Sequence, residues 1–363
     1  MEPVKFIRTA SLSGGSDQAG QAMPIIRNVN SAPSNPRRAA KSLRCRCGGK
    51  TVYFRAYNGE SLCAECFNNS IIGKVKKTIS KYEMLRYGDK VGVAVSGGKD
   101  STSLLYILSK ITQGHGTKLF ALTIDEGIEG YREEAIKNAK DLAEKLSVEL
   151  LVCSYREFFG QTLDSALKDR SSKGVRTTSC AVCGPLRRRS IDRAAEQLGV
   201  NVVATAHNLD DMLQTFFINL YSGDLERISW LDPSSSGSNS EFKLRRIKPM
   251  IEIYEQEIAL FAYLNNLPFQ SESCPYMDEG IRSEIRLHLN ELESKHPGIK
   301  YGTLRTVLGI SSSLELSPSK MKKAMRCERC GSVSTGPVCS VCLTLELIQG
   351  RPLRSIAQRK ETN

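Results

Sequence analysis

The residues best suited to chemistry form a short polar string that directly follows an apolar run. Ser96-Gly97-Gly98-Lys99-Asp100-Ser101 comes after the apolar residues 91–95, and helical periodicity resumes near Thr102. A strand that ends in a Gly-rich turn and continues as a helix directs backbone N–H groups and a helix N-terminus at one point, which favours binding of an anion. The string is not the eight-residue nucleotide loop that ends in Gly-Lys-Ser/Thr, because its glycines lie too close to the lysine. We therefore predict a phosphate-binding loop of another kind, the alternative being a Gly-rich turn that binds nothing.

Acidic residues at the ends of two further apolar runs are the next candidates. Asp125 closes the run 118–125, where it either contacts the adenosine part of a nucleotide or caps the following turn. His207-Asn208-Leu209-Asp210-Asp211 directly follows the run 201–206. Paired carboxylates opposite a phosphate loop suit magnesium binding or acid–base chemistry. Asp210 or Asn208 is equally suited to cap the next helix, and the two roles are compatible.

Three cysteines in the middle of the chain form a separate candidate site. Cys180-Ala-Val-Cys183 is followed by Arg187-Arg188-Arg189, and Cys274 stands alone further downstream. We expect a helix to start at Pro185, so that its positive end and the arginines lower the pKa values of Cys180 and Cys183. Three thiolates without a fourth suit an iron–sulfur cluster with one iron open to another ligand. On spacing alone, a disulfide-forming redox pair is an equally good interpretation.

Eight other cysteines fall into two sets of four, and four thiolates can surround one tetrahedral zinc ion. The C-terminal set consists of two Cys-x-x-Cys pairs and predicts a zinc ribbon, whereas the N-terminal set begins with a tighter Cys-x-Cys pair. Cys153 lies within an apolar run, so we expect it to be a small buried hydrophobic residue without chemistry. The two sets are Cys45, Cys47, Cys63 and Cys66, and Cys327, Cys330, Cys339 and Cys342.

Composition limits the classes of protein that fit. The chain has 363 residues, of which 40% are hydrophobic, and this is enough for about two domains with a real core. No apolar run reaches the ~18 residues that a membrane helix needs, so we expect no membrane contact. Twelve cysteines, most of them in close pairs, indicate a reducing compartment and metal ligation. The net charge of +12 predicts attraction to a polyanion such as RNA through residues 187–189, Arg245, Arg246 and Lys248, although a solvated basic face is the alternative.

The elements that must position these residues alternate between strand and helix. Such alternation predicts an α/β fold with a doubly wound parallel sheet, whose ligands bind at the carboxyl ends of the strands. Apolar runs and periodicity place strands at 91–95, 118–125, 149–154, 201–206 and 243–248, and helices at 67–86, 131–146, 212–220 and 252–265.

The phosphate loop resembles that of the pyrophosphate-loop ATPases, an adenine nucleotide alpha hydrolase-like group that releases pyrophosphate while adenylating an acceptor oxygen. The ordered set of motifs resembles the tRNA 2-thiolation proteins more specifically, and among them the cytoplasmic branch that acts on the wobble uridine. The resemblance covers roughly residues 45–347. Its motifs are 96–101, 124–132, Cys180-x-x-Cys183-Gly with Arg187-Arg188, 207–211, Ser273-Cys274-Pro275 and the terminal zinc modules.

The resemblance implies a sulfurtransferase that uses ATP with Mg to adenylate the C2 oxygen of uridine before sulfur replaces it. It implies that Lys99 and the loop glycines hold phosphates, that Asp125 and His207 flank the nucleotide, and that Asp211 and Arg187 are catalytic. Cys180, Cys183 and Cys274 would be the ligands of a 4Fe–4S cluster. The implied partners are tRNA for Lys, Glu and Gln, a thiocarboxylated ubiquitin-related modifier as sulfur donor, and an inactive paralogous second subunit. The implied location is cytoplasmic.

Three other functions remain open from the sequence. A related thiolase could modify another tRNA position, a pyrophosphate-loop ligase or amidotransferase would need no cluster, and a zinc-ribbon RNA-binding scaffold would need no catalysis. The Cys45-x-Cys47 pair departs from the usual Cys-x-x-Cys spacing of a zinc site, and residues 300–319 match no motif.

The domain boundaries follow from these motifs. The segment 1–40 is expected to be a disordered basic tail, with a mitochondrial targeting segment as the less favoured alternative. The remaining predicted parts are an N-terminal zinc module and basic helix (41–88), the pyrophosphate-loop ATPase domain (89–270), a helical region with the third cluster cysteine (271–326), the zinc ribbon (327–346) and a flexible tail (347–363).

Overall fold

The structure, a computed structural model, describes residues 44–175, 177–231, 233, 244–277, 280–314, 325–334, 336–350 and 353. It divides into two compact units, Met1–Ser70 and Ile71–Asn363. The predicted tail 1–40 and most of the predicted tail 347–363 lie outside the described residues. The domain boundaries expected from sequence stay predictions.

The first unit contains a small antiparallel hairpin. Strand β1 (Tyr53–Arg55) pairs with β2 (Glu60–Leu62), and the helix α2 (Ala64–Lys81) follows. The rings of Tyr53 and Phe67 pack edge to face with centroids 5.1 Å apart. This hairpin and the start of α2 carry the first set of four cysteines.

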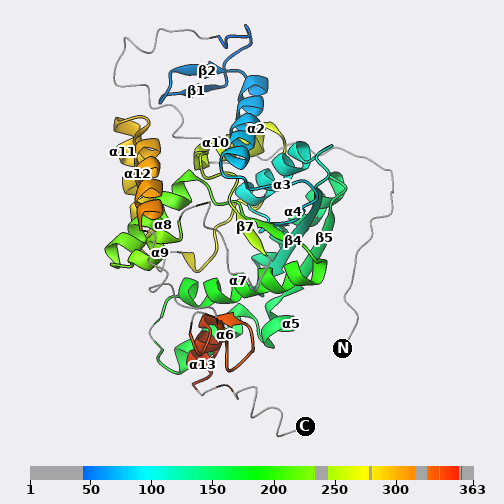
Figure 1. Cartoon of the computed structure of the whole chain (residues 1–363), viewed down its shortest axis with the longest axis vertical. Coiled ribbons are helices and arrows are strands. Elements are labelled where there is room, and N and C mark those ends of the chain that lie inside the picture. The colour runs from blue at the N-terminus through cyan, green and yellow to red at the C-terminus, as the bar shows by residue number, and fades with distance from the viewer. Residues whose placement is uncertain are drawn as a thin grey trace. The chain divides into compact units, whose positions relative to one another are not determined.

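The second unit is built on a five-stranded sheet in the order β5-β4-β3-β6-β7. Every neighbouring pair is parallel, which confirms the predicted α/β fold (Figure 1). The chain runs outward from β3 in both directions, to β4 on one side and to β6 on the other, so the carboxyl ends of β3 and β6 flank the crevice where such sheets bind ligands. The strands are β3 (Lys90–Ala94), β4 (Lys118–Asp125), β5 (Glu149–Ser154), β6 (Val202–Ala204) and β7 (Arg245–Ile247).

The helices that matter for the site start at the carboxyl ends of these strands. Helix α3 begins at Lys99, three residues earlier than expected, and α8 begins at Leu209 because Asn208 caps it. The prediction that a helix starts at Pro185 is wrong. Thr178 caps α7 six residues earlier by accepting a hydrogen bond from the Ala181 N–H (3.2 Å), and Pro185 lies inside the helix, where it has no N–H to donate to the Ala181 carbonyl. The helices are α3 (Lys99–Ile111), α4 (Arg132–Lys145), α7 (Ser179–Leu198), α8 (Leu209–Tyr221) and α10 (Glu255–Leu264).

The remaining elements include the C-terminal module and the helices that lead to it. Helix α12 accounts for most of the segment 300–319, which had no sequence motif. None of the described helices is both long and apolar enough to cross a membrane. These elements are α5 (Tyr155–Phe159), α6 (Leu163–Ser172), α9 (Leu225–Ser229), α11 (Arg282–Lys295), α12 (Ile299–Ser313), β8 (Met325–Arg326), β9 (Val333–Ser334) and α13 (Ser340–Gln349).

One hydrophobic cluster joins the sheet to the C-terminal module. It contains Leu122 and Leu151 from the sheet, Leu186 from α7, and Cys327 and Ile348 from the module, all nearly inaccessible to solvent. Helix α13 contacts both α6 and α7. Three cysteines of the second set, Cys327, Cys339 and Cys342, are therefore part of the core of the second unit, whereas Cys330 is exposed.

Candidate active site

The phosphate loop has the backbone geometry of an anion site. Gly97 has φ of +86°, and a Cβ there would lie 2.2 Å from the backbone oxygen of Ala135, so only glycine fits. Gly98 caps α3 without a side-chain hydrogen bond, which leaves N–H groups of the first turn available to a ligand. The Ser101 hydroxyl accepts from the Ser96 N–H (3.1 Å) and donates to the Gly98 oxygen (3.0 Å). Hydrogen bonds within the predicted loop therefore hold its conformation at the end of β3.

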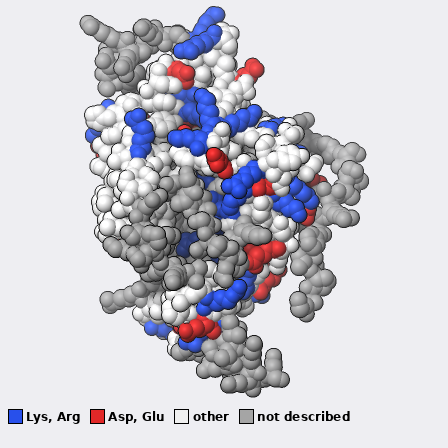
Figure 2. Space-filling model, viewed as in Figure 1, with Lys and Arg blue, Asp and Glu red and all other residues white. Residues whose placement is uncertain are grey.

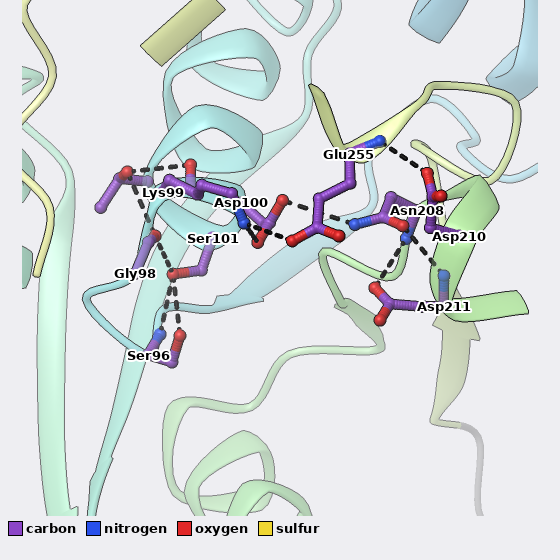
Figure 3. Close-up of polar contacts among 10 residues, drawn as sticks. Ser96, Gly98, Lys99, Asp100, Ser101, Asn208, Asp210, Asp211 and Glu255 are labelled. Atoms are coloured by element: carbon purple, nitrogen blue, oxygen red, sulfur yellow. Dashed lines mark hydrogen bonds and ion pairs between the residues drawn. The ribbon is translucent and has the colours of Figure 1, made fainter. Parts of the chain in front are cut away.

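Lys99 projects from this loop into a cluster of carboxylates (Figure 3). Its Nζ lies 2.9 Å from Asp100 and 2.9 Å from Glu255, the first residue of α10. Burial alone would lower the pKa of Lys99, but the two carboxylates more than offset it and the pKa rises. Lys99 is therefore a fixed positive charge. Glu255 was not found from sequence, because a glutamate at a helix start is ordinary and nothing local links it to residue 99.

Asn208 and Asp211 form the opposite side of the same cluster. The Asn208 side chain accepts from the Asp211 N–H (3.0 Å) and donates to Asp100 (3.4 Å), while Asp211 accepts from the Asn208 N–H (3.2 Å). This capping box fixes Asp211 at the start of α8. Burial, together with the nearby charges of Asp100 and Glu255, raises the pKa of Asp211 to about 6.

Asp210 does not join Asp211 in a shared magnesium site, as the adjacent carboxylates had suggested. Its carboxylate forms a buried ion pair with Lys300 of α12 and accepts a hydrogen bond from the Glu255 N–H (2.8 Å). Lys300 also donates to Asn290 (2.5 Å). Asp210 is thus engaged in holding α8, α10 and α12 together. The segment 300–319, which matches no sequence motif, therefore supplies a buried partner for Asp210. The sequence could not reveal this pair because Asp210 and Lys300 lie 90 residues apart.

Asp125 is the last residue of β4, as expected, and His207 lies three residues after the end of β6. Asp125 accepts from the Gly127 N–H (2.8 Å), so it caps the following turn; its contact with adenosine stays a prediction. The His207 ring pairs with the Thr205 hydroxyl (2.9 Å). The surrounding protein displaces water from His207, and this desolvation is the main cause that lowers its pKa to about 4. The positive charges of Lys248 and Arg282 lower the pKa further, so the ring is neutral at physiological pH.

Cys183 is the best defined of the three central cysteines. Its Sγ lies 3.3 Å from an Nη of Arg187 and 3.3 Å from the Tyr155 hydroxyl. The expected lowering of its pKa is wrong: burial raises the pKa of Cys183, and Arg187 offsets only part of this. The pKa of Cys274 is also raised, by burial first and further by the nearby Cys183 and Cys180. The reason is that Cys183 lies in the hydrophobic cluster rather than ahead of a helix start.

A buried carboxylate next to these cysteines was missed from sequence. Glu126 follows β4 and is 4% exposed. It lies 2.8 Å from Arg187 and 2.7 Å from Arg132. The segment 124–132 was recognised as a motif, but no spacing rule assigns a role to a single glutamate within it.

The two outer sets of cysteines fit zinc. In each set the four sulfurs lie within 4.8 Å of one another, which matches the tetrahedral site of one zinc ion. The Cys45-x-Cys47 pair is accommodated because Gly49 has no side chain: a Cβ there would lie 3.0 Å from the Cβ of Cys63. Cys180, Cys183 and Cys274 are not grouped so tightly among the described residues, and a cluster of several irons requires wider spacing than a single zinc ion does.

The predicted basic residues divide into paired and unpaired groups. Arg245 lies 2.5 Å from Asp89, and Arg246 pairs with Asp192. Arg188 and Lys248 form no ion pair with the described residues, and burial and then nearby Arg246 lower the pKa of each. Figure 2 shows Lys and Arg side chains gathered on the face that is viewed. The unpaired cations are thus the better candidates for an external anion.

The fold and this site define a PP-loop ATP-binding protein, and residues 68–293 match the PP-loop domain family. The cytoplasmic tRNA 2-thiolation protein 1 of Drosophila ananassae is 33% identical over 325 residues, covering 88% of this chain and 92% of the relative. That of Chlamydomonas reinhardtii is 33% identical over 321 residues, covering 88% of each chain. The chain therefore belongs to the cytoplasmic tRNA 2-thiolation protein 1 family.

A solved structure with this fold supports the assignment. The U34-tRNA thiolase NcsA from Methanococcus maripaludis, determined with its 4Fe–4S cluster, matches with a TM-score of 0.73 and 29% sequence identity. The match covers 87% of this chain and 98% of NcsA. The likeness therefore extends well beyond the phosphate loop.

Proposed function

We propose that the protein is an ATP-dependent tRNA sulfurtransferase that adenylates the C2 oxygen of the wobble uridine and replaces this oxygen with sulfur. The observation that carries the proposal is the juxtaposition of the phosphate loop and the cysteines. Gln270 donates its N–H to the Gly97 oxygen (2.9 Å) four residues before Cys274. Glu126, which follows β4, pairs with Arg187 of α7, and Arg187 contacts the Cys183 sulfur. These contacts support a site in which a base activated at the loop meets sulfur held by the cysteines.

The first half of the reaction uses the phosphate loop. The loop N–H groups and Lys99 bind the β- and γ-phosphates, and Asp100 with Glu255 supplies carboxylate oxygens for Mg. The uridine C2 oxygen attacks the α-phosphate and pyrophosphate leaves. Asp211 accepts the proton from N3 of the uracil, a role for which a pKa of about 6 is well matched near neutral pH.

The second half forms the C2–S bond and breaks the C2–O bond, so that AMP leaves with the oxygen. Cys180, Cys183 and Cys274 would hold a 4Fe–4S cluster with one iron open, and a cluster of this kind supplies a site that binds and delivers sulfide. The residues fit such a group, because the three thiols lie near one another: beyond the effect of burial, the charges of Cys183 and Cys180 both raise the pKa of Cys274. Arg187 keeps its positive charge because Glu126 raises its pKa further, which favours anionic sulfur nearby.

The finer points of the proposal come from the family. The substrates would be the tRNAs for Lys, Glu and Gln, and the sulfur donor a thiocarboxylated ubiquitin-related modifier. A paralogous second subunit would accompany the enzyme in the cytoplasm. The two outer four-cysteine sites would hold structural zinc.

The test uses protein purified without oxygen, ATP, tRNA and a sulfide source. Lys99→Ala removes the charge that faces the phosphates, so we expect pyrophosphate release and thiouridine, measured by mass spectrometry of the tRNA, to fall to background. Lys110→Ala, at the exposed far end of α3, is the matched control and keeps parental rates.

Other outcomes would separate the alternative functions. Parental rates in Lys99→Ala would contradict the loop assignment. Thiouridine at another tRNA position would indicate a different thiolase, and pyrophosphate release without iron or thiouridine would indicate a ligase or amidotransferase.

A further inference from the structure

A continuous path of contacts connects the phosphate loop to the cysteine-bearing helix. Arg132 is 5% exposed, and its two Nη atoms donate to the backbone oxygens of Ser96 (2.9 Å) and Ile124 (2.7 Å). Its Nε lies 2.7 Å from Oε2 of Glu126. One end of the path is therefore fixed to the loop and to β4 by buried hydrogen bonds.

The other end of the path reaches the cysteine site through Arg187. Oε1 of Glu126 lies 2.8 Å from Nε of Arg187, and an Nη of Arg187 lies 3.3 Å from Sγ of Cys183. The Glu126 side chain is 5% exposed, whereas the Arg187 side chain is 49% exposed. Packing therefore does not fix Arg187, and a free arginine side chain would populate many rotamers. Glu126 is the one carboxylate in the described contacts that fixes this guanidinium.

We propose that Glu126 is a positioning residue that holds the Arg187 guanidinium against the Cys183 sulfur, so that sulfur transfer depends on it while ATP use does not. The inference rests on the proposed function, because it assigns Glu126 to the second half of that reaction. Glu126 acts on the cysteine site only through Arg187. Arg132 supplies the rigid support, since its own hydrogen bonds to the loop and to β4 do not need Glu126.

The alternative is a purely structural role, in which Glu126 supports the phosphate loop through Arg132. The two roles differ in what they affect. Loss of loop support lowers pyrophosphate release and thiolation together, whereas loss of Arg187 positioning lowers thiolation alone.

The experiment is a double-mutant cycle of Glu126→Gln, Arg187→Met and the double variant in the full-length protein after cluster reconstitution. Gln retains the shape and one acceptor oxygen but removes the charge. Glu129→Gln, three residues away on an exposed side chain, is the control. Single-turnover thiolation, pyrophosphate release and the electron paramagnetic resonance spectrum of the reduced protein are measured on each.

We expect Glu126→Gln to lower thiolation about tenfold, the effect typical of removing a residue that orients a metal-site ligand, while pyrophosphate release changes little. The resonance spectrum should change in the same way as in Arg187→Met, and the double variant should lose no more than Arg187→Met alone. Additive losses, a parental spectrum in Glu126→Gln, or equal losses of both activities would overturn the inference. If the parental protein formed no thiouridine in tRNA, the proposed function would be wrong, and the inference would fail with it.

Discussion

Lys99 already has two carboxylate partners before any ligand binds. Asp100 and Glu255 each lie 2.9 Å from its Nζ, so the positive charge of the lysine is balanced within the protein. Incoming phosphates compete with these carboxylates for the lysine, and a divalent cation that binds the carboxylates removes this competition. The geometry thus favours ATP that arrives with its metal.

Asp211 gives a prediction of pH-dependent stability. Its folded-state pKa of about 6 lies above that of an unfolded carboxyl group, so folding favours the protonated form. The stability that this provides is present below about pH 4 and is lost as the pH rises through about 6. Asp211→Asn is neutral at every pH, and its Oδ1 can still accept the Asn208 N–H. We expect it to be more stable than the parental protein by roughly 1 kcal/mol at about pH 7.5, and equal near pH 4.

Denaturant unfolding at the two pH values measures this difference. Asp141→Asn, on the exposed face of α4, is the control and should show no such dependence on pH. An Asp211→Asn variant that is less stable than the parental protein at neutral pH would show that the carboxylate is stabilised in the folded state.

Single residues differed in how well sequence predicted them. The loop residues and the cysteines were found because their chemistry is tied to local spacing. Glu255, Glu126 and Lys300 were not, because each acts through a partner more than 50 residues away, and a charged residue of this type is usually solvated. Their roles arise only when the parallel sheet brings the ends of its strands together.

Helix α7 carries two of the three cysteines that we propose as cluster ligands. It brings Cys180 and Cys183 to the site from its first turns, and Cys274 approaches from the segment after α10. A thiol-only route needs two of the three cysteines, whereas a cluster needs all three as ligands. We expect Cys180→Ala, Cys183→Ala and Cys274→Ala each to abolish thiolation and iron binding, while pyrophosphate release and zinc content persist.

Iron, zinc and sulfide assays and thiouridine measurement on each variant check this prediction. Cys153→Ala is the matched control, because Cys153 is buried in β5 with its thiol directed at Gln197, and it should retain thiolation. Near-parental thiolation in one of the three variants would favour a persulfide route.

Two strands were predicted closely because buried parallel strands appear as apolar runs: 118–125 and 149–154 agree at both ends with β4 and β5. Strands β6 and β7 are shorter than the predicted 201–206 and 243–248. Helix starts were less predictable. Pro185 appeared to begin a helix, but the Thr178 cap sets the start of α7. A capping residue competes with a proline, and only the folded backbone decides between them.

The surface charge of the second unit gives a prediction for tRNA binding. Arg188 and Lys248 have no ion-pair partner among the described residues, whereas Arg245 is paired with Asp89. Each phosphate contact should contribute ~0.7 to 0.9 to the slope of log affinity against log salt. We expect Arg188→Ala and Lys248→Ala each to reduce the slope by about one contact.

Filter binding of tRNA over a salt series measures the slope. Arg245→Ala is the control, because its charge is already neutralised within the protein, and its slope should equal the parental one. A tRNA affinity that does not depend on salt would contradict the prediction that these cations bind tRNA phosphates.

The C-terminal cysteine module makes the protein sensitive to the cell's supply of metals. Cys327, Cys339 and Cys342 are almost fully buried in the cluster that also contains Leu186 of α7, so the ion that joins them would hold the helix that presents Cys180 and Cys183. Without this zinc ion, the helix that presents two of the proposed iron ligands would lose its support. Zinc deficiency in a cell would then lower the amount of assembled cluster, and its effect on this protein would resemble that of iron deficiency.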